Sequence, residues 1–174
     1  MPKAMLGDYI DLVEGFPVVD LDTAGASADY INMKDVETLM VVFASGVGTA
    51  GQDPVLDFEQ ASDNSGTGNK ALSLPTTSST RVWKKQAATS LASTTQWTDG
   101  SGDVSTAALT NATGAEQSCL WAVEIFPSDL DVANAFDHVR VTIDDDMSNT
   151  QPGYLLYIIK PLYPSAPDST VSYL

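Results

Sequence analysis

The sequence predicts an all-β fold, an antiparallel sandwich or jelly-roll-like domain with short helical turns. Short runs rich in β-branched and aromatic residues recur along the chain, with turn-forming residues between them. No long segment has the 3.6-residue apolar periodicity of an amphipathic helix. This spacing favours a sandwich or barrel over alternating strands and helices. The predicted strands are 16–21, 37–44, 55–60, 71–74, 81–86, 118–126, 136–143 and 154–160.

Two kinds of apolar pattern indicate how the strands face the core. In 136–143, valine and isoleucine alternate with polar residues, which predicts a half-buried strand with His138 on its solvent side. Segments 39–44 and 154–159 are instead apolar at nearly every position. We expect these two to be central strands that are covered on both faces.

The length of 174 residues fits one domain. We expect an N-terminal arm over 1–15, a β-sandwich domain over 16–160 and a proline-rich C-terminal arm over 161–174. Segment 63–69 is rich in residues that tolerate positive φ, so it predicts a hairpin loop. Segment 127–134 predicts a short helical corner that Ser128 or Asp129 could cap. Segment 105–115 could form either a short helix or a loop.

The segment 46–51 carries the spacing G-x-G-x-x-G after an apolar run, as a dinucleotide-binding loop does. Such a loop needs a helix that begins at its third glycine, so that the helix N-terminus faces the pyrophosphate. Here Gly51 is followed by Pro54 and an alternating segment, which predicts another strand. We therefore expect a tight loop and no cofactor.

The charge is strongly acidic, with 8 Lys and Arg against 23 Asp and Glu and a net charge of −15. Phosphate backbones and anionic lipid surfaces repel such a chain, so neither nucleic acid nor a membrane is an expected partner. The charge serves solubility, or it matches a basic partner. No apolar stretch suits a signal peptide or a membrane span, so we expect synthesis in the cytoplasm.

Residues able to carry catalysis are sparse. Cys119 is the single cysteine and lies in an apolar run, which is typical of a buried, inert thiol. His138 is the single histidine, and no serine sits in a G-x-S-x-G elbow. Paired carboxylates leave a glycosidase-type activity as the least favoured alternative. Calcium binding is a further alternative for the acidic clusters Asp20/Asp22, Asp129/Asp131 and 144–146, although none follows the EF-hand pattern. We expect no enzyme activity and no metal.

Two tryptophans are candidate partner-binding residues. Arg81, Trp83 and Lys85 share one face of a predicted strand, and Trp97 lies in a Gly/Ser-rich segment. Tryptophan and arginine are enriched where partners bind. The alternative is structural, with a Lys or Arg stem packed over a half-buried Trp83.

The chain resembles a family of small virion proteins of tailed bacteriophages. The first resemblance is Leu39-Met-Val-Val-Phe with its glycine-rich loop, followed by Leu56-Asp-Phe-Glu-Gln-Ala-Ser-Asp-Asn-Ser-Gly-Thr-Gly-Asn-Lys-Ala-Leu72. The second is Trp121-Ala-Val-Glu-Ile, the segment 129–141, and the strand and tail 154–163. Members of this family are taken to be head decoration (cement) or minor structural proteins, and no catalytic or cofactor residue comes with the resemblance.

The resemblance implies a capsid decoration protein that binds the major capsid protein on the virion exterior. It also implies a symmetric oligomer, with a trimer favoured. A head–tail joining or tail component is the runner-up, and a carbohydrate-binding module that stacks sugars on Trp83 or Trp97 is an alternative from another class. The residues expected to contact a partner are Met5, Leu6, Tyr9, Ile10, Trp83, Trp97 and Tyr163.

Overall fold

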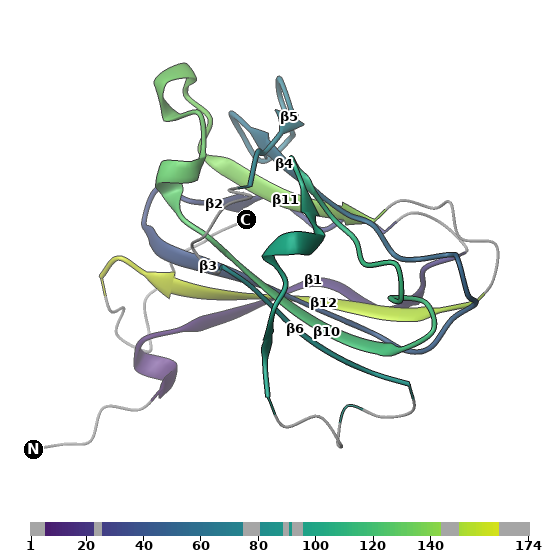
Figure 1. Cartoon of the computed structure of the whole chain (residues 1–174). Helices are drawn as coiled ribbons and strands as arrows, with labels where there is room; N and C mark the ends of the chain where they lie inside the picture. The colour runs from purple at the N-terminus through teal and green to yellow at the C-terminus, as the bar shows by residue number, and fades with distance from the viewer. Residues whose placement is uncertain are drawn as a thin grey trace, which may run out of the picture.

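A computed structural model describes residues 6–22, 26–74, 81–88, 91, 96–143 and 150–163. It confirms the predicted fold class, because two antiparallel sheets pack face to face (Figure 1). Sheet A has the strand order β1-β12-β3-β10-β6-β7, and sheet B has the order β2-β11-β4-β9-β8 with β5 paired to β4. The strands of sheet A are β1 (Asp11–Asp20), β12 (Pro152–Pro161), β3 (Val36–Ser45), β10 (Ser118–Ile125), β6 (Val82–Ala87) and β7 (Thr98–Asp99). Those of sheet B are β2 (Ile31–Asn32), β11 (His138–Ile143), β4 (Leu56–Ala61), β9 (Ala108–Leu109), β8 (Val104–Ser105) and β5 (Lys70–Ala71).

The strand order is that of a jelly roll with one insertion. Counted along the chain without β5–β8, the eight remaining strands are arranged in the two sheets in the orders 1-8-3-6 and 2-7-4-5. Two interlocked Greek keys give this order, which is the double-sheet jelly roll. The inserted segment 70–105 lies between β4 and β9 and adds β6 and β7 to the edge of sheet A beyond β10.

The core lies between the sheets and follows from period-two alternation. Leu39, Val41 and Phe43 of β3 point inward, and their neighbours in β12 and β10 are also buried. Trp121 packs against Phe43 with ring centroids 5.4 Å apart. From sheet B, alternating residues of β4 and β11 complete the same cluster. The alternation predicted for 136–143 is therefore confirmed on its apolar side.

Local structure confirms several predicted elements and shifts others. The loop 63–69 joins β4 to β5, with Gly66 and Gly68 at positive φ. The helical corner comprises η4 (Pro127–Asp129) and η5 (Val132–Asn134), and the carboxylate of Asp129 accepts the backbone N–H of Phe126. Segment 105–115 is not a helix, because β8 and β9 form a hairpin there. Residues 11–15, predicted to belong to an arm, form the first half of β1.

Candidate functional site

The side of sheet A that points away from sheet B is apolar across its centre. We call this surface the outer face of sheet A. In the strand register, Trp83 lies beside Ala122, Ala122 beside Val42 and Val42 beside Leu156. Parallel rows on either side contain Leu120, Ala44 and Tyr154, and Glu124, Met40 and Ile158. Apart from Ala122, which is buried, all of these side chains are half-buried.

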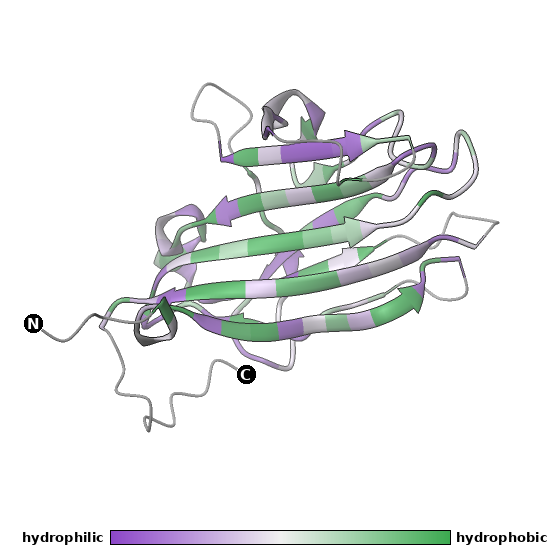
Figure 2. Ribbon diagram, turned by 90° about the horizontal axis from the view of Figure 1, so that it is seen from below, coloured by the Kyte–Doolittle hydropathy of each residue, from purple (hydrophilic) through white to green (hydrophobic). Residues whose placement is uncertain are grey.

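Figure 2 views this face directly, with β6, β10, β3, β12 and β1 from top to bottom. The three middle strands are hydrophobic over most of their length, and hydrophilic residues gather in β6, whereas β1 has a few hydrophilic positions among hydrophobic ones. No described element lies across the face in this view. An antiparallel sheet with one solvated face normally alternates apolar and polar residues, and these middle strands do not.

The outer face of sheet B is polar by comparison. Arg140 Nε lies 2.6 Å from Glu59 Oε2, and the same guanidinium lies over the Tyr30 ring. Thr142 and Asp57 occupy neighbouring positions of the same two strands. The two outer faces therefore differ in chemistry, and only that of sheet A resembles a surface meant to be covered.

This asymmetry revises one prediction. Segments 39–44 and 154–159 are central strands of sheet A, as predicted. Coverage of both their faces is not found among the described residues, because sheet B covers only the inner one. The apolar residues at Met40, Val42, Leu156 and Ile158 are the surface that the sequence prediction missed. The sequence did contain a feature that indicates this surface, because apolar and polar residues do not alternate in these two strands.

The structure brings Trp83 and Trp97 together at the β6 edge of this face. Both come from the inserted segment, and they line a groove of about 370 Å³. Met40, Ala122 and Glu124 of the jelly roll complete the lining. The Lys85 ammonium lies 4.9 Å from the centre of the Trp97 ring, and Trp97 is 44% exposed. Trp83 and Lys85 share the outer side of β6, as predicted, while Val82 points into the core.

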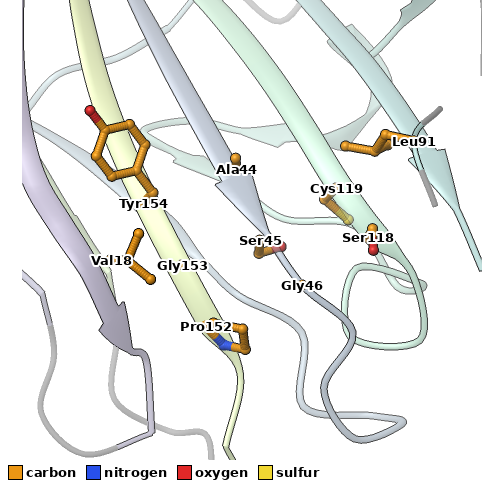
Figure 3. A pocket seen from close by; sticks show the side chains of 10 residues that line it. All are labelled: Val18, Ala44, Ser45, Gly46, Leu91, Ser118, Cys119, Pro152, Gly153 and Tyr154. Atoms are coloured by element: carbon orange, nitrogen blue, oxygen red, sulfur yellow. The ribbon is translucent and has the colours of Figure 1, made fainter. Parts of the chain in front are cut away.

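A second hollow, of about 410 Å³, lies at the opposite end of the strands, where β3 ends and β12 begins (Figure 3). Val18, Leu91 and Tyr154 give it an apolar wall, and Ser118 and Cys119 lie on its β10 side. Burial raises the pKa of the Cys119 thiol, which donates to the Gly114 carbonyl. The prediction that Cys119 is buried is confirmed.

His138 is not the solvated residue predicted from the alternation of its strand. It is 8% exposed, and its Nδ1 lies 2.5 Å from Asp137 Oδ1. Lys34 forms an ion pair with Asp137, so His138 lies beside a charged Lys34–Asp137 pair. The alternation correctly placed His138 on the outward side of β11, but it could not show that neighbouring residues bury the side chain there. His138 lies in sheet B, and Cys119 and Ser118 lie in sheet A.

The acidic clusters serve structural hydrogen bonds where they are described. Asp20 accepts the backbone N–H groups of Asp22 and Gln151. Asp129 pairs with Arg81, and Asp131 pairs with Lys70. Segment 144–146 lies outside the described residues. Within the described ranges, no three His, Cys, Asp or Glu side chains gather as a metal site would require.

The glycine segment 46–51 is a loop that leads to a strand, as predicted. Gly51 has φ of 77°, and β4 begins at Leu56 with no helix between them. The loop is held by Gly48, whose N–H donates to the Ala115 carbonyl, and by Asp53, which accepts the N–H of Ala115.

Among the other predicted contact residues, those that the structure describes do not line the groove. Leu6 and Tyr9, in and beside η1 (Leu6–Asp8), are exposed, and Ile10 is half-buried. Tyr163 follows β12 and is 73% exposed. Met5 and the tail from 164 lie outside the described residues.

In the part of the chain that the structure describes, no helix has the length and apolar character that a membrane crossing requires. No protein-family model, curated protein or solved structure matches the chain.

Proposed function

We propose that this chain is a viral structural protein that decorates and stabilises the capsid of a tailed phage by binding the major capsid protein. The observation that carries the proposal is the apolar outer face of sheet A, opposite a polar outer face on sheet B. Contiguous exposed apolar surface of this kind marks interaction sites. The resemblance to phage virion proteins supplies the setting, the virion exterior, and the partner.

The size of the face supports a specific contact. Five strands about 4.8 Å apart, each contributing about six residues at 3.4 Å, cover roughly 500 Å². Burial of this area on both partners removes roughly 1,000 Å² from water, the lower bound for a specific interface. A modest contact suffices for a decoration protein, because many copies of an oligomer act together on one particle. A symmetric oligomer, with a trimer favoured, is part of the proposal.

The fold is compatible with this role, but the fold alone does not distinguish it from other functions. Jelly rolls occur in viral capsid proteins and also in lectins. The alternative of a carbohydrate-binding module therefore keeps one specific observation in its favour, the groove that holds Trp83 and Trp97. A head–tail joining or tail component would use the same apolar face at another place on the virion.

The test is binding to expanded capsids of the encoding phage that lack the protein. The purified chain is expected to sediment with them and to raise their thermal stability, and deletion of residues 1–9, which precede β1, or of the tail from 164 is expected to weaken binding. Absence of the protein from purified heads would overturn the proposal. Labelling confined to the neck or tail would favour the runner-up, and glycan binding that Trp97→Ala abolishes would favour the carbohydrate module.

A further inference from the structure

The Trp83–Trp97 groove has a chemistry of its own within the outer face of sheet A. It lies where the insertion joins the jelly roll, so two indole rings from β6 and the segment before β7 stand against Met40 and Glu124 of β3 and β10. A jelly roll closes without this insertion. The groove is thus an addition to the scaffold, not a consequence of it.

The cations of the chain indicate what the groove attracts. The sequence has eight Lys and Arg, and all except Lys3 lie in the described residues. Six of those described are ion-paired with Asp or Glu. Lys85 has no acidic partner within the described ranges, and its ammonium lies over the Trp97 ring instead. The face of an indole ring carries negative potential and holds cations in this way.

Glu124 adds a charge to the same place. Its carboxylate has no hydrogen bond or ion pair among the described residues, although the side chain is half-buried and lines the groove. The Glu124 side chain is half-buried, so water screens its charge less than that of a fully exposed carboxylate, and an incoming cation is attracted more strongly. Two indoles, a thioether and one free carboxylate are complementary to a basic side chain, and the net charge of −15 attracts one from a distance.

We propose that the Trp83–Trp97 groove binds an arginine side chain on an extended segment of the partner protein. A guanidinium is planar and weakly hydrated, so it can stack on one indole while its N–H groups reach the Glu124 carboxylate. This inference rests on the proposed function for its partner, and it names the chemistry by which the partner is recognised. Contacts of this type give specificity and fast association more than affinity.

The experiment uses the isolated full chain and a defined probe, the tripeptide acetyl-Gly-Arg-Gly-amide, with its citrulline counterpart as the neutral control. Titration is followed by the NMR signals of the Trp83 and Trp97 indole N–H groups. We expect both signals to move with a dissociation constant of about 10 mM. The citrulline peptide should bind at least about fivefold more weakly.

Matched variants separate the groove from general attraction to an acidic protein. Glu124→Gln is expected to lower the affinity for the arginine peptide about threefold to fivefold. Glu14→Gln removes the same charge from an exposed position on β1 and is expected to leave binding unchanged. Trp97→Phe, which keeps an aromatic ring, should retain more binding than Trp97→Ala.

Equal binding of the citrulline peptide, or equal weakening by Glu14→Gln, would overturn the inference. So would cellohexaose or maltohexaose moving the two indole signals when the arginine peptide does not. Because the probe requires no capsid, its failure is distinct from failure of capsid binding. If the chain binds the arginine peptide but not capsids, the groove still binds arginine, and the major capsid protein is excluded as its partner.

Discussion

Replacement of Val42 by lysine tests the outer face of sheet A at its centre. Val42 lies between Ala122 and Leu156 in the register, and its side chain is half-buried. In the free protein, the lysine stem can lie along the apolar surface while the ammonium reaches water. The cost in folding free energy is therefore bounded by the span of β-propensities, about 1 kcal/mol.

The same lysine is much more costly when the face is covered. At the centre of an interface, the ammonium would be enclosed without an acidic partner. Changes at such central positions cost about 2 kcal/mol or more, which is about 30-fold in affinity. We expect Val42→Lys to lower affinity for expanded capsids by at least this factor while urea unfolding shifts only slightly.

Thr142→Lys is the matched control for this substitution. It also replaces a β-branched residue by lysine at a half-buried, outward position, but on β11 of sheet B. Capsid co-sedimentation and urea unfolding are measured for both variants. Unchanged affinity in Val42→Lys, or equal loss in the two variants, would show that the outer face of sheet A does not provide the contact.

Two further predictions concern folding and pH. A Cβ at Gly153 would lie 2.6 Å from Leu21 Cδ1, so Gly153→Ala is expected to destabilise the fold by about 1–3 kcal/mol in urea unfolding. Gly102→Ala, where nothing lies within 4 Å, should change it by less than about 0.5 kcal/mol, and equal effects would contradict the packing described. The hydrogen bond from Lys70 is the main cause that lowers the pKa of Asp131, so its contribution is present above the unfolded pKa of about 3.9 and is lost as pH falls through the folded value. Asp131→Asn should therefore lose less stability than the wild type between pH 5 and 2, and identical acid profiles would contradict the pairing.

The local features of the fold could be predicted from sequence because they depend on near neighbours. Alternation in 136–143 identified the inward valines of β11, and the Gly/Asn content of 63–69 identified a hairpin loop. The jelly-roll order could not be predicted, because it depends on pairings such as β1 with β12 between opposite ends of the chain. The burial of His138 was not predicted for the same reason, since its neighbours in the sheet, Asn32 of β2 and Ala61 of β4, come from distant segments of the chain.

The candidate site was predictable in its parts but not in its assembly. Trp83 and Trp97 were each predicted as candidate partner-binding residues, yet their proximity depends on β6 and β7 pairing beside β10. The outer face of sheet A was visible as two strands without alternation, and the pattern was assigned to coverage within the chain. Periodicity alone cannot distinguish a strand covered by its own fold from one covered by a partner.

The most direct test of the central claim is a three-dimensional reconstruction of the virion that carries this chain. We expect the protein on the outside of the head, with the outer face of sheet A, including Val42 and Leu156, against the major capsid protein. A particle in which that face lies open to solvent, with contact made through sheet B, would contradict it.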